Sequence, residues 1–65
     1  MIRVNGVSLE TPVGSSLEEF ILAQGYKKEA VAVGLNQQVV RRADYPTVIL
    51  KDGDLVEIFK FTQGG

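Results

Sequence analysis

Only one stretch of the chain has the spacing of an amphipathic helix, and this limits the folds that the chain can adopt. The apolar residues of the helical face are Leu17, Phe20 and Ile21. The preceding pattern Ser15-Ser16-Leu17-Glu18 predicts a capping box, in which a serine oxygen accepts from the first-turn amides and Glu18 reaches back. Gly25 supplies the left-handed residue that commonly follows a helix. The sequence therefore predicts a single main helix over residues 16–24.

The remaining segments have the patterns of strands and turns. Strands are predicted at residues 2–4, 7–11, 31–35, 38–40 and 55–61. Asn5-Gly6 is a strong hairpin signal, because a type I′ turn needs positive φ at both central positions. Asn36-Gln37 predicts a second hairpin, residues 41–47 a polar loop with room for one short helical turn, and residues 51–54 a tight turn. We therefore expect an α+β fold in one domain, residues 1–65, with a mixed sheet of four to five strands and one main helix packed across it.

The last strand shows which face of this sheet is buried. Val56 and Ile58 point to one side, where both should lie under the helix. The residues that point to the other side are Leu55, Glu57, Phe59 and Phe61. Because a single helix covers only one face, we expect the second face to meet water. Phe59 and Phe61 then form an exposed apolar patch, which favours a partner-binding face.

Composition excludes several functions. A chain of 65 residues without cysteine has neither disulfides nor thiolate metal ligands, so its hydrophobic core must hold it together. It also lacks histidine and any Gly-rich phosphate loop, which predicts a protein that is not an enzyme and binds no metal or cofactor. Seven basic and eight acidic residues, with no concentrated basic run, argue against nucleic-acid binding. The opening MIRVNG lacks the long apolar run of a signal peptide, and no stretch approaches membrane-spanning length, so a cytoplasmic protein is expected. We also expect the protein to be monomeric when free.

The last residues, FTQGG, end in two glycines. We expect residues 62–65 to be a flexible C-terminal tail that reaches about 13 Å beyond the sheet when extended. Without side chains, Gly64 and Gly65 fit a narrow active site of another protein. The terminal carboxylate, with a usual pKa of about 3.3–3.7, is a poor electrophile and must be activated, for example by adenylation. The dipeptide alone fits a frayed end equally well.

Two longer segments identify a related family. GLNQQVVRR contains a strand–Asn–strand motif followed by Arg42, and KDGDLVEIFKFTQGG contains a Gly-Asp turn, a last strand and terminal Gly-Gly. In this order they resemble the ThiS family of sulfur carriers of thiamin biosynthesis, in the ubiquitin-like β-grasp superfamily. The resemblance implies that an E1-like adenylyltransferase of the ThiF type adenylates Gly65. A sulfur donor protein then converts Gly65 to a thiocarboxylate, and a thiazole synthase of the ThiG type takes the sulfur. It implies that Gly64 gives access to the end, and it makes Arg42, Phe59 and Phe61 candidate partner contacts.

Three alternatives share this fold or chemistry. The small subunit of molybdopterin synthase is also a β-grasp sulfur carrier that ends in Gly-Gly. A ubiquitin-like interaction module would use the fold without sulfur chemistry, and a protein modifier would join Gly65 to lysines of its targets. Fold alone does not separate these functions. The sequence assigns no role to Arg41 or Tyr45.

Overall fold

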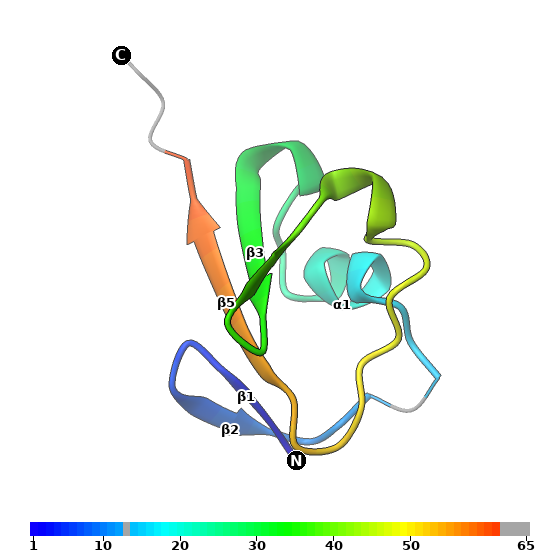
Figure 1. Cartoon of the computed structure of the whole chain (residues 1–65), viewed down its shortest axis with the longest axis vertical. Coiled ribbons are helices and arrows are strands. Elements are labelled where there is room, and N and C mark those ends of the chain that lie inside the picture. Colours follow the sequence, from blue (N-terminus) through cyan, green and yellow to red (C-terminus); the bar gives the residue numbers. More distant parts are fainter. Residues whose placement is uncertain (13, 62–65) are drawn as a thin grey trace.

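The computed structural model describes residues 1–12 and 14–61, which form one five-stranded sheet with one α-helix against it (Figure 1). The strands are β1 (Ile2–Val4), β2 (Val7–Leu9), β3 (Val31–Leu35), β4 (Gln38–Val40) and β5 (Leu55–Lys60). The helices are α1 (Leu17–Ala23) and the short 3₁₀ turns η1 (Lys28–Ala30) and η2 (Arg42–Asp44). The strand order is β2-β1-β5-β3-β4, with β1 and β5 parallel and the other pairs antiparallel. This is the expected α+β, ubiquitin-like β-grasp fold, and β5 lies at its centre.

Helix α1 begins with a capping box, one residue later than the sequence pattern predicts. Ser16 is the N-cap: its Oγ accepts a hydrogen bond from the Glu19 amide at 3.1 Å, and the Glu19 carboxylate accepts from the Ser16 amide at 2.9 Å. The prediction of Glu18 as the reaching carboxylate was therefore wrong. Ser15 and Ser16 both have an acidic residue three positions on, so the local pattern alone does not choose between them.

Contacts from a distant segment select the later start. The amide of Leu17 donates to the carbonyl of Val48 at 2.7 Å, and the amide of Glu18 donates to the carbonyl of Tyr45 at 3.1 Å. These two donors have no partner inside the helix. A helix of seven residues is too short to be stable alone, so this capping by the loop after η2 is part of what holds α1 in place.

Two hairpins form at the predicted turns, each of which begins with an asparagine. Asn5 and Gly6 have φ values of 49° and 84°, and Asn36 and Gln37 have 52° and 71°. Strand β2 ends at Leu9, which pairs with Ile2, so the predicted continuation to residue 11 was wrong. The reason is that β1 begins at Ile2 and offers no strand residue further along for pairing.

The last strand ends one residue earlier than predicted. The prediction carried this strand to Phe61, but β5 ends at Lys60, which pairs with Val31, the first residue of β3. Phe61 still donates its amide to the carbonyl of Ala30 at 2.9 Å. The pairing therefore stops where η1 replaces β3 as the neighbouring segment.

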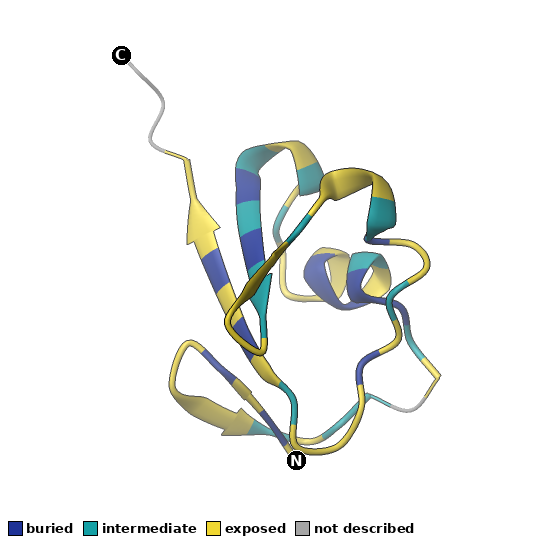
Figure 2. Ribbon diagram, viewed as in Figure 1, coloured by how far each residue is buried: buried dark blue, intermediate teal, exposed yellow. Residues whose placement is uncertain are grey.

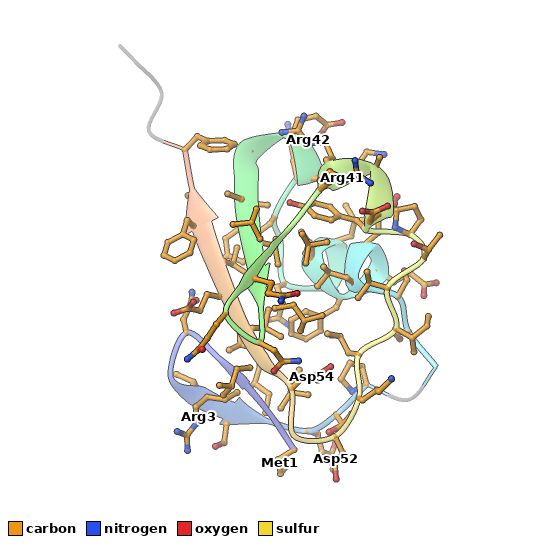
Figure 3. The ribbon with its side chains drawn as sticks, viewed as in Figure 1. Met1, Arg3, Arg41, Arg42, Asp52 and Asp54 are labelled. Carbon is orange, nitrogen blue, oxygen red and sulfur yellow. The ribbon has the colours of Figure 1, made fainter. Side chains whose placement is uncertain are left out.

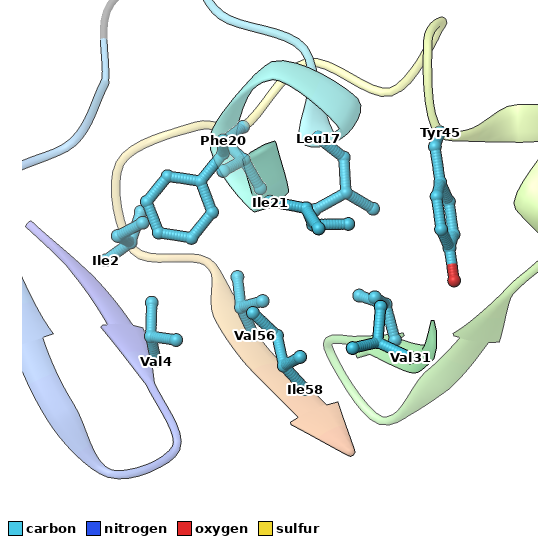
Figure 4. Packing of buried hydrophobic residues seen from close by; sticks show 11 residues of the cluster. Ile2, Val4, Leu17, Phe20, Ile21, Val31, Tyr45, Val56 and Ile58 are labelled. Carbon is cyan, nitrogen blue, oxygen red and sulfur yellow. The ribbon is translucent and has the colours of Figure 1, made fainter. Parts of the chain in front are cut away.

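The core lies between α1 and one face of the sheet. Figure 4 shows Leu17 and Ile21 of α1 above Val56 and Ile58 of β5. Other buried apolar side chains are Ile2, Val4, Phe20, Val31, Val33, Tyr45 and Leu50. The two predicted inward residues of β5 are therefore confirmed. Tyr45 was predicted to lie in a polar loop, yet its side chain is only 2% exposed.

Candidate partner-binding surface

The outer face of the sheet carries a hollow that we call the apolar groove, defined by Ala32, Gly34, Val39 and Phe59. Ala32 on β3 pairs with Phe59 on β5, and Gly34 pairs with Val39 on β4. The small residues of β3 form a low floor between the larger side chains on either side. The hollow measures about 270 Å³ and is also lined by Gln37, Gln38 and Glu57. Val39 is 83% exposed and Phe59 57% exposed, so both walls of the groove face water.

Gly34 gives the groove its depth without any backbone requirement for glycine. Its φ is not positive, and a Cβ placed there would lie 3.7 Å from Oε1 of Glu57, an ordinary contact. A glycine inside a strand leaves space for a close approach by another molecule. Sequence reasoning missed Gly34, Ala32 and Val39 as site residues; the glycine at the middle of a strand pattern was the available signal.

The two predicted aromatic residues are exposed as expected, Phe59 on the outer face of β5 and Phe61 directly after its end. Figure 2 shows buried and exposed positions alternating over residues 55–59. Phe59 and Phe61 are 57% and 53% exposed. The apolar surface therefore continues from the groove to the end of β5, and residues 62–65 follow it in the chain. The expectation that Phe59 and Phe61 contact a partner stays a prediction.

Arg42 lies at the same end of the sheet as the end of β5 (Figure 3). Its Nε donates to the carbonyl of Lys28 at 3.0 Å, while the amide of Phe61 donates to the carbonyl of Ala30. Both predicted contact residues are therefore held against η1. Arg41 pairs with Asp44, with 3.3 Å between Nε and Oδ2.

The other predicted site residues, Gly64 and Gly65, lie outside the described residues, as does the predicted flexible tail, residues 62–65. Within residues 1–12 and 14–61, no group of three or more His, Cys, Asp or Glu side chains could hold a metal ion. No helix in the same part of the chain is long and apolar enough to cross a membrane. The described residues thus present an exposed apolar surface for contact.

An ion pair between the Met1 amino group and Asp52 lies at the opposite end of the molecule. The Met1 amino group, which donates to the Asp52 carboxylate, together with the Thr11 hydroxyl, holds the pKa of that carboxyl below its ordinary value. Figure 3 places Met1 and Asp52 together, far from Arg41 and Arg42. These contacts join the first strand to the turn before β5, so their role is structural.

Comparisons with known proteins match most of the chain or nearly all of it. The model of the ThiS family matches residues 2–65. A thiazole synthase of Magnetococcus marinus is 36% identical over 64 residues, which cover 98% of this chain and 20% of that protein. A sulfur carrier protein ThiS of Thermus thermophilus is 36% identical over 52 residues, 80% of this chain and 81% of that protein. The crystal structure of a thiamine biosynthesis protein (ThiS) from Geobacter metallireducens superposes with a TM-score of 0.76 at 34% identity, covering 98% of this chain and 97% of that one. The chain thus spans about a fifth of the thiazole synthase, but most of the other two proteins.

Proposed function

The chain belongs to the ThiS family, and we propose that it is a sulfur carrier protein of thiamin biosynthesis. The observation that carries this proposal is the family match over residues 2–65, which includes the final Gly64-Gly65. Two of the similar proteins, those of Thermus thermophilus and Geobacter metallireducens, are described as ThiS. In this function the chain is a co-substrate of other enzymes, not an enzyme, and acts in the cytoplasm as a monomer when free.

The chemistry takes place at the carboxylate of Gly65. A carboxylate oxygen attacks the α-phosphorus of ATP in the active site of an E1-like adenylyltransferase, and pyrophosphate leaves. Sulfide-level sulfur from a donor then attacks the carbonyl carbon and displaces AMP, which leaves a thiocarboxylate. Gly64 keeps the chain narrow beside the reacting carbon. The thiocarboxylate is an anionic nucleophile that stays attached to a protein its next partner recognises.

The partners hold the carrier by the outer face of the sheet. The apolar groove and Phe61 offer exposed apolar surface on the central strand that leads to the tail. Such surface on a small monomer is typical of interaction sites. A thiazole synthase is one expected partner. In support, the thiazole synthase of Magnetococcus marinus contains a segment similar to this chain within a longer polypeptide.

Intact mass spectrometry tests this function. The protein is incubated with its cognate adenylyltransferase, Mg-ATP and sulfide, and its mass is compared with that of a sample without ATP. We expect a gain equal to one sulfur minus one oxygen, with fragment ions that place the change on Gly65. A lysine-linked conjugate, or no mass change while the enzyme activates another carrier protein, would refute the proposal.

A further inference from the structure

Basic side chains gather at one end of the molecule. Five of the seven basic residues belong to η1, η2 or the segments next to them and to the end of β5; we call this set the basic rim. Its members are Lys27, Lys28, Arg41, Arg42 and Lys60. The hydrogen bond from Arg42 to the Lys28 carbonyl brings η1 and η2 together, and Lys60 pairs with Val31 directly after η1. The rim therefore borders the place where residues 62–65 continue from β5.

The side-chain charge is divided unevenly between the two ends. The rim shares its end with three acidic residues, Glu18, Glu29 and Asp44, so this end has a net side-chain charge of +2. The rest of the molecule has two basic and five acidic residues, a net of −3. Figure 3 shows Arg41 and Arg42 at one end and Asp52 and Asp54 at the other. The balanced total charge of the sequence conceals this asymmetry.

Two acidic residues at the other end, Asp52 and Asp54, form hydrogen bonds within the fold. Asp54 accepts hydrogen bonds from the side chain of Asn36 at 3.0 Å and from the amide of Lys51 at 2.8 Å. Asp52 accepts from the Met1 amino group and from Thr11. These carboxylates fix the turn before β5, so their placement has a structural reason.

Only some of the cations of the rim form ion pairs with carboxylates of the described residues. Lys28 lies 3.8 Å from Glu18, and Arg41 pairs with Asp44. Among residues 1–12 and 14–61, no carboxylate lies within 4.0 Å of the charged groups of Lys27, Arg42 or Lys60. The Lys60 ammonium lies 6.0 Å from the centre of the Tyr26 ring, at the outer limit of a cation–π contact. Arg42 has a structural contact in its bond to the Lys28 carbonyl, but folding does not explain why the cations of Lys27 and Lys60 border the start of the tail.

We propose that the basic rim pairs with an acidic surface around the active-site entrance of the enzyme that activates the tail. This inference rests on the proposed function. A carrier must bind its activating enzyme and then leave it for the next partner, so fast association is more useful than a very stable complex. Complementary charges raise association rate constants by about 10- to 1,000-fold at low salt. The apolar groove holds the bound carrier, while the rim guides the tail to the entrance.

An acidic protein surface fits the rim better than a nucleic acid does. Protein surfaces that bind a phosphate backbone usually carry several cations with no carboxylates among them. Here three carboxylates lie among five cations, and two of the three form ion pairs with rim residues. A mixed pattern with a modest net charge is typical of protein–protein contacts that set orientation and rate.

Charge reversal tests the rim with a matched control. Lys27→Glu, Lys60→Glu and their double variant are compared with Lys51→Glu, which makes the same charge change in the turn at the opposite end. Stopped-flow measurements give the association rate constant with the cognate adenylyltransferase over a range of NaCl concentrations. We expect the double variant to associate about tenfold more slowly at low salt, with a flatter salt dependence. Lys51→Glu should stay within about twofold of the parent, and thermal melts establish that all variants fold.

Three outcomes would overturn the inference: unchanged association of the double variant, equal slowing by Lys51→Glu, or rim-dependent binding of a DNA or RNA duplex with unchanged enzyme association. The proposed function is judged separately, by thiocarboxylate formation on the parent chain at saturating enzyme. If the parent forms no thiocarboxylate, the function itself is refuted. If the parent and the double variant form it equally and associate equally fast, only the role of the rim is refuted.

Discussion

Tyr45 links the core to the charged end of the molecule. Its ring fills the core beside Leu17 and Val31 (Figure 4). Its backbone forms two hydrogen bonds. The carbonyl accepts from the amide of Glu18 at the start of α1, and the amide donates to the carbonyl of Arg42 at 3.1 Å. One residue in a polar stretch therefore closes the core, caps the helix and anchors η2. This gives a structural role to a residue for which the sequence suggested none.

Replacing Tyr45 should test this role. Tyr45→Ala removes a buried aromatic ring and leaves a cavity, which costs about 3–5 kcal/mol. A domain of this size has a net stability of roughly 3–5 kcal/mol, so the variant should be largely unfolded at 25 °C. Tyr45→Phe keeps the ring and should cost less than about 1.5 kcal/mol. Urea titrations followed by circular dichroism give both values. A loss below about 1 kcal/mol for Tyr45→Ala would show that the ring is not a core element.

At the scale of elements, β5 divides two roles between its faces. Val56 and Ile58 are at most 5% exposed and pack under α1, whereas Phe59 and Phe61 are more than half exposed. The side chain of Asn5 also holds β5 at Ile58. Its Oδ1 accepts a hydrogen bond from the Ile58 amide at 2.8 Å, and its Nδ2 donates one to the Ile58 carbonyl at 3.2 Å. The strand is therefore fixed through its inner face and backbone, which leaves the outer face free to contact a partner.

Two alanine substitutions separate these roles. Ile58→Ala should lower the free energy of unfolding by about 2–4 kcal/mol because it opens a cavity in the core. Phe59→Ala should change that free energy little, since its side chain is exposed, but should weaken binding to the adenylyltransferase or the synthase by about 1–2 kcal/mol. Urea titrations measure the first effect and calorimetric titration the second. The reverse ranking would place Phe59 in the core and remove the case for the apolar groove as a binding surface.

The local sequence predicted the buried and exposed faces of β5, because alternation along one strand depends only on the residues of that strand. It also predicted both asparagine turns and the buried face of α1. It did not predict the choice of Ser16 as the cap, which depends on the carbonyls of Val48 and Tyr45. The groove was missed for the same reason, since its walls and floor come from three strands whose register is a property of the whole sheet. Contacts between distant segments were thus the part that local patterns could not supply.

At the scale of the whole molecule, the basic rim and the end of β5 lie at one end, where residues 62–65 follow in the chain. The apolar groove runs along the outer face of the sheet, from Phe59 near that end to Gln37 in the turn between β3 and β4. The opposite end holds the turn with Asp52 and Asp54, whose contacts are internal. If the chain acts as proposed, a partner on the sheet face also meets the rim and receives the tail. In the proposed function, binding and chemistry depend on different residues and can be separated by mutation.

Changes at the last two residues should abolish chemistry and leave folding intact. Deleting Gly65 moves the carboxylate back by one residue, about 3.3–3.6 Å, too far to attack an ATP α-phosphorus held at a fixed position. Gly64→Val adds a β-branched side chain where, in the proposed function, the narrow active site of the adenylyltransferase admits only backbone, and it restricts the φ and ψ values available there. The described core cluster is formed by residues between Ile2 and Ile58, so we expect changes at the end of the chain to leave the free energy of unfolding within about 0.5 kcal/mol of the parent.

Pyrophosphate exchange catalysed by the cognate adenylyltransferase measures the effect on chemistry. We expect exchange to be lost with the deletion and to fall sharply with Gly64→Val. Calorimetric titration with the same enzyme serves as the control: both variants should still bind, because Phe59, Val39 and the basic rim are unchanged. Loss of exchange together with loss of binding would mean that the tail, and not the sheet face, supplies most of the affinity. A deletion variant that exchanges pyrophosphate at the parent rate would show that Gly65 is not the residue that is activated.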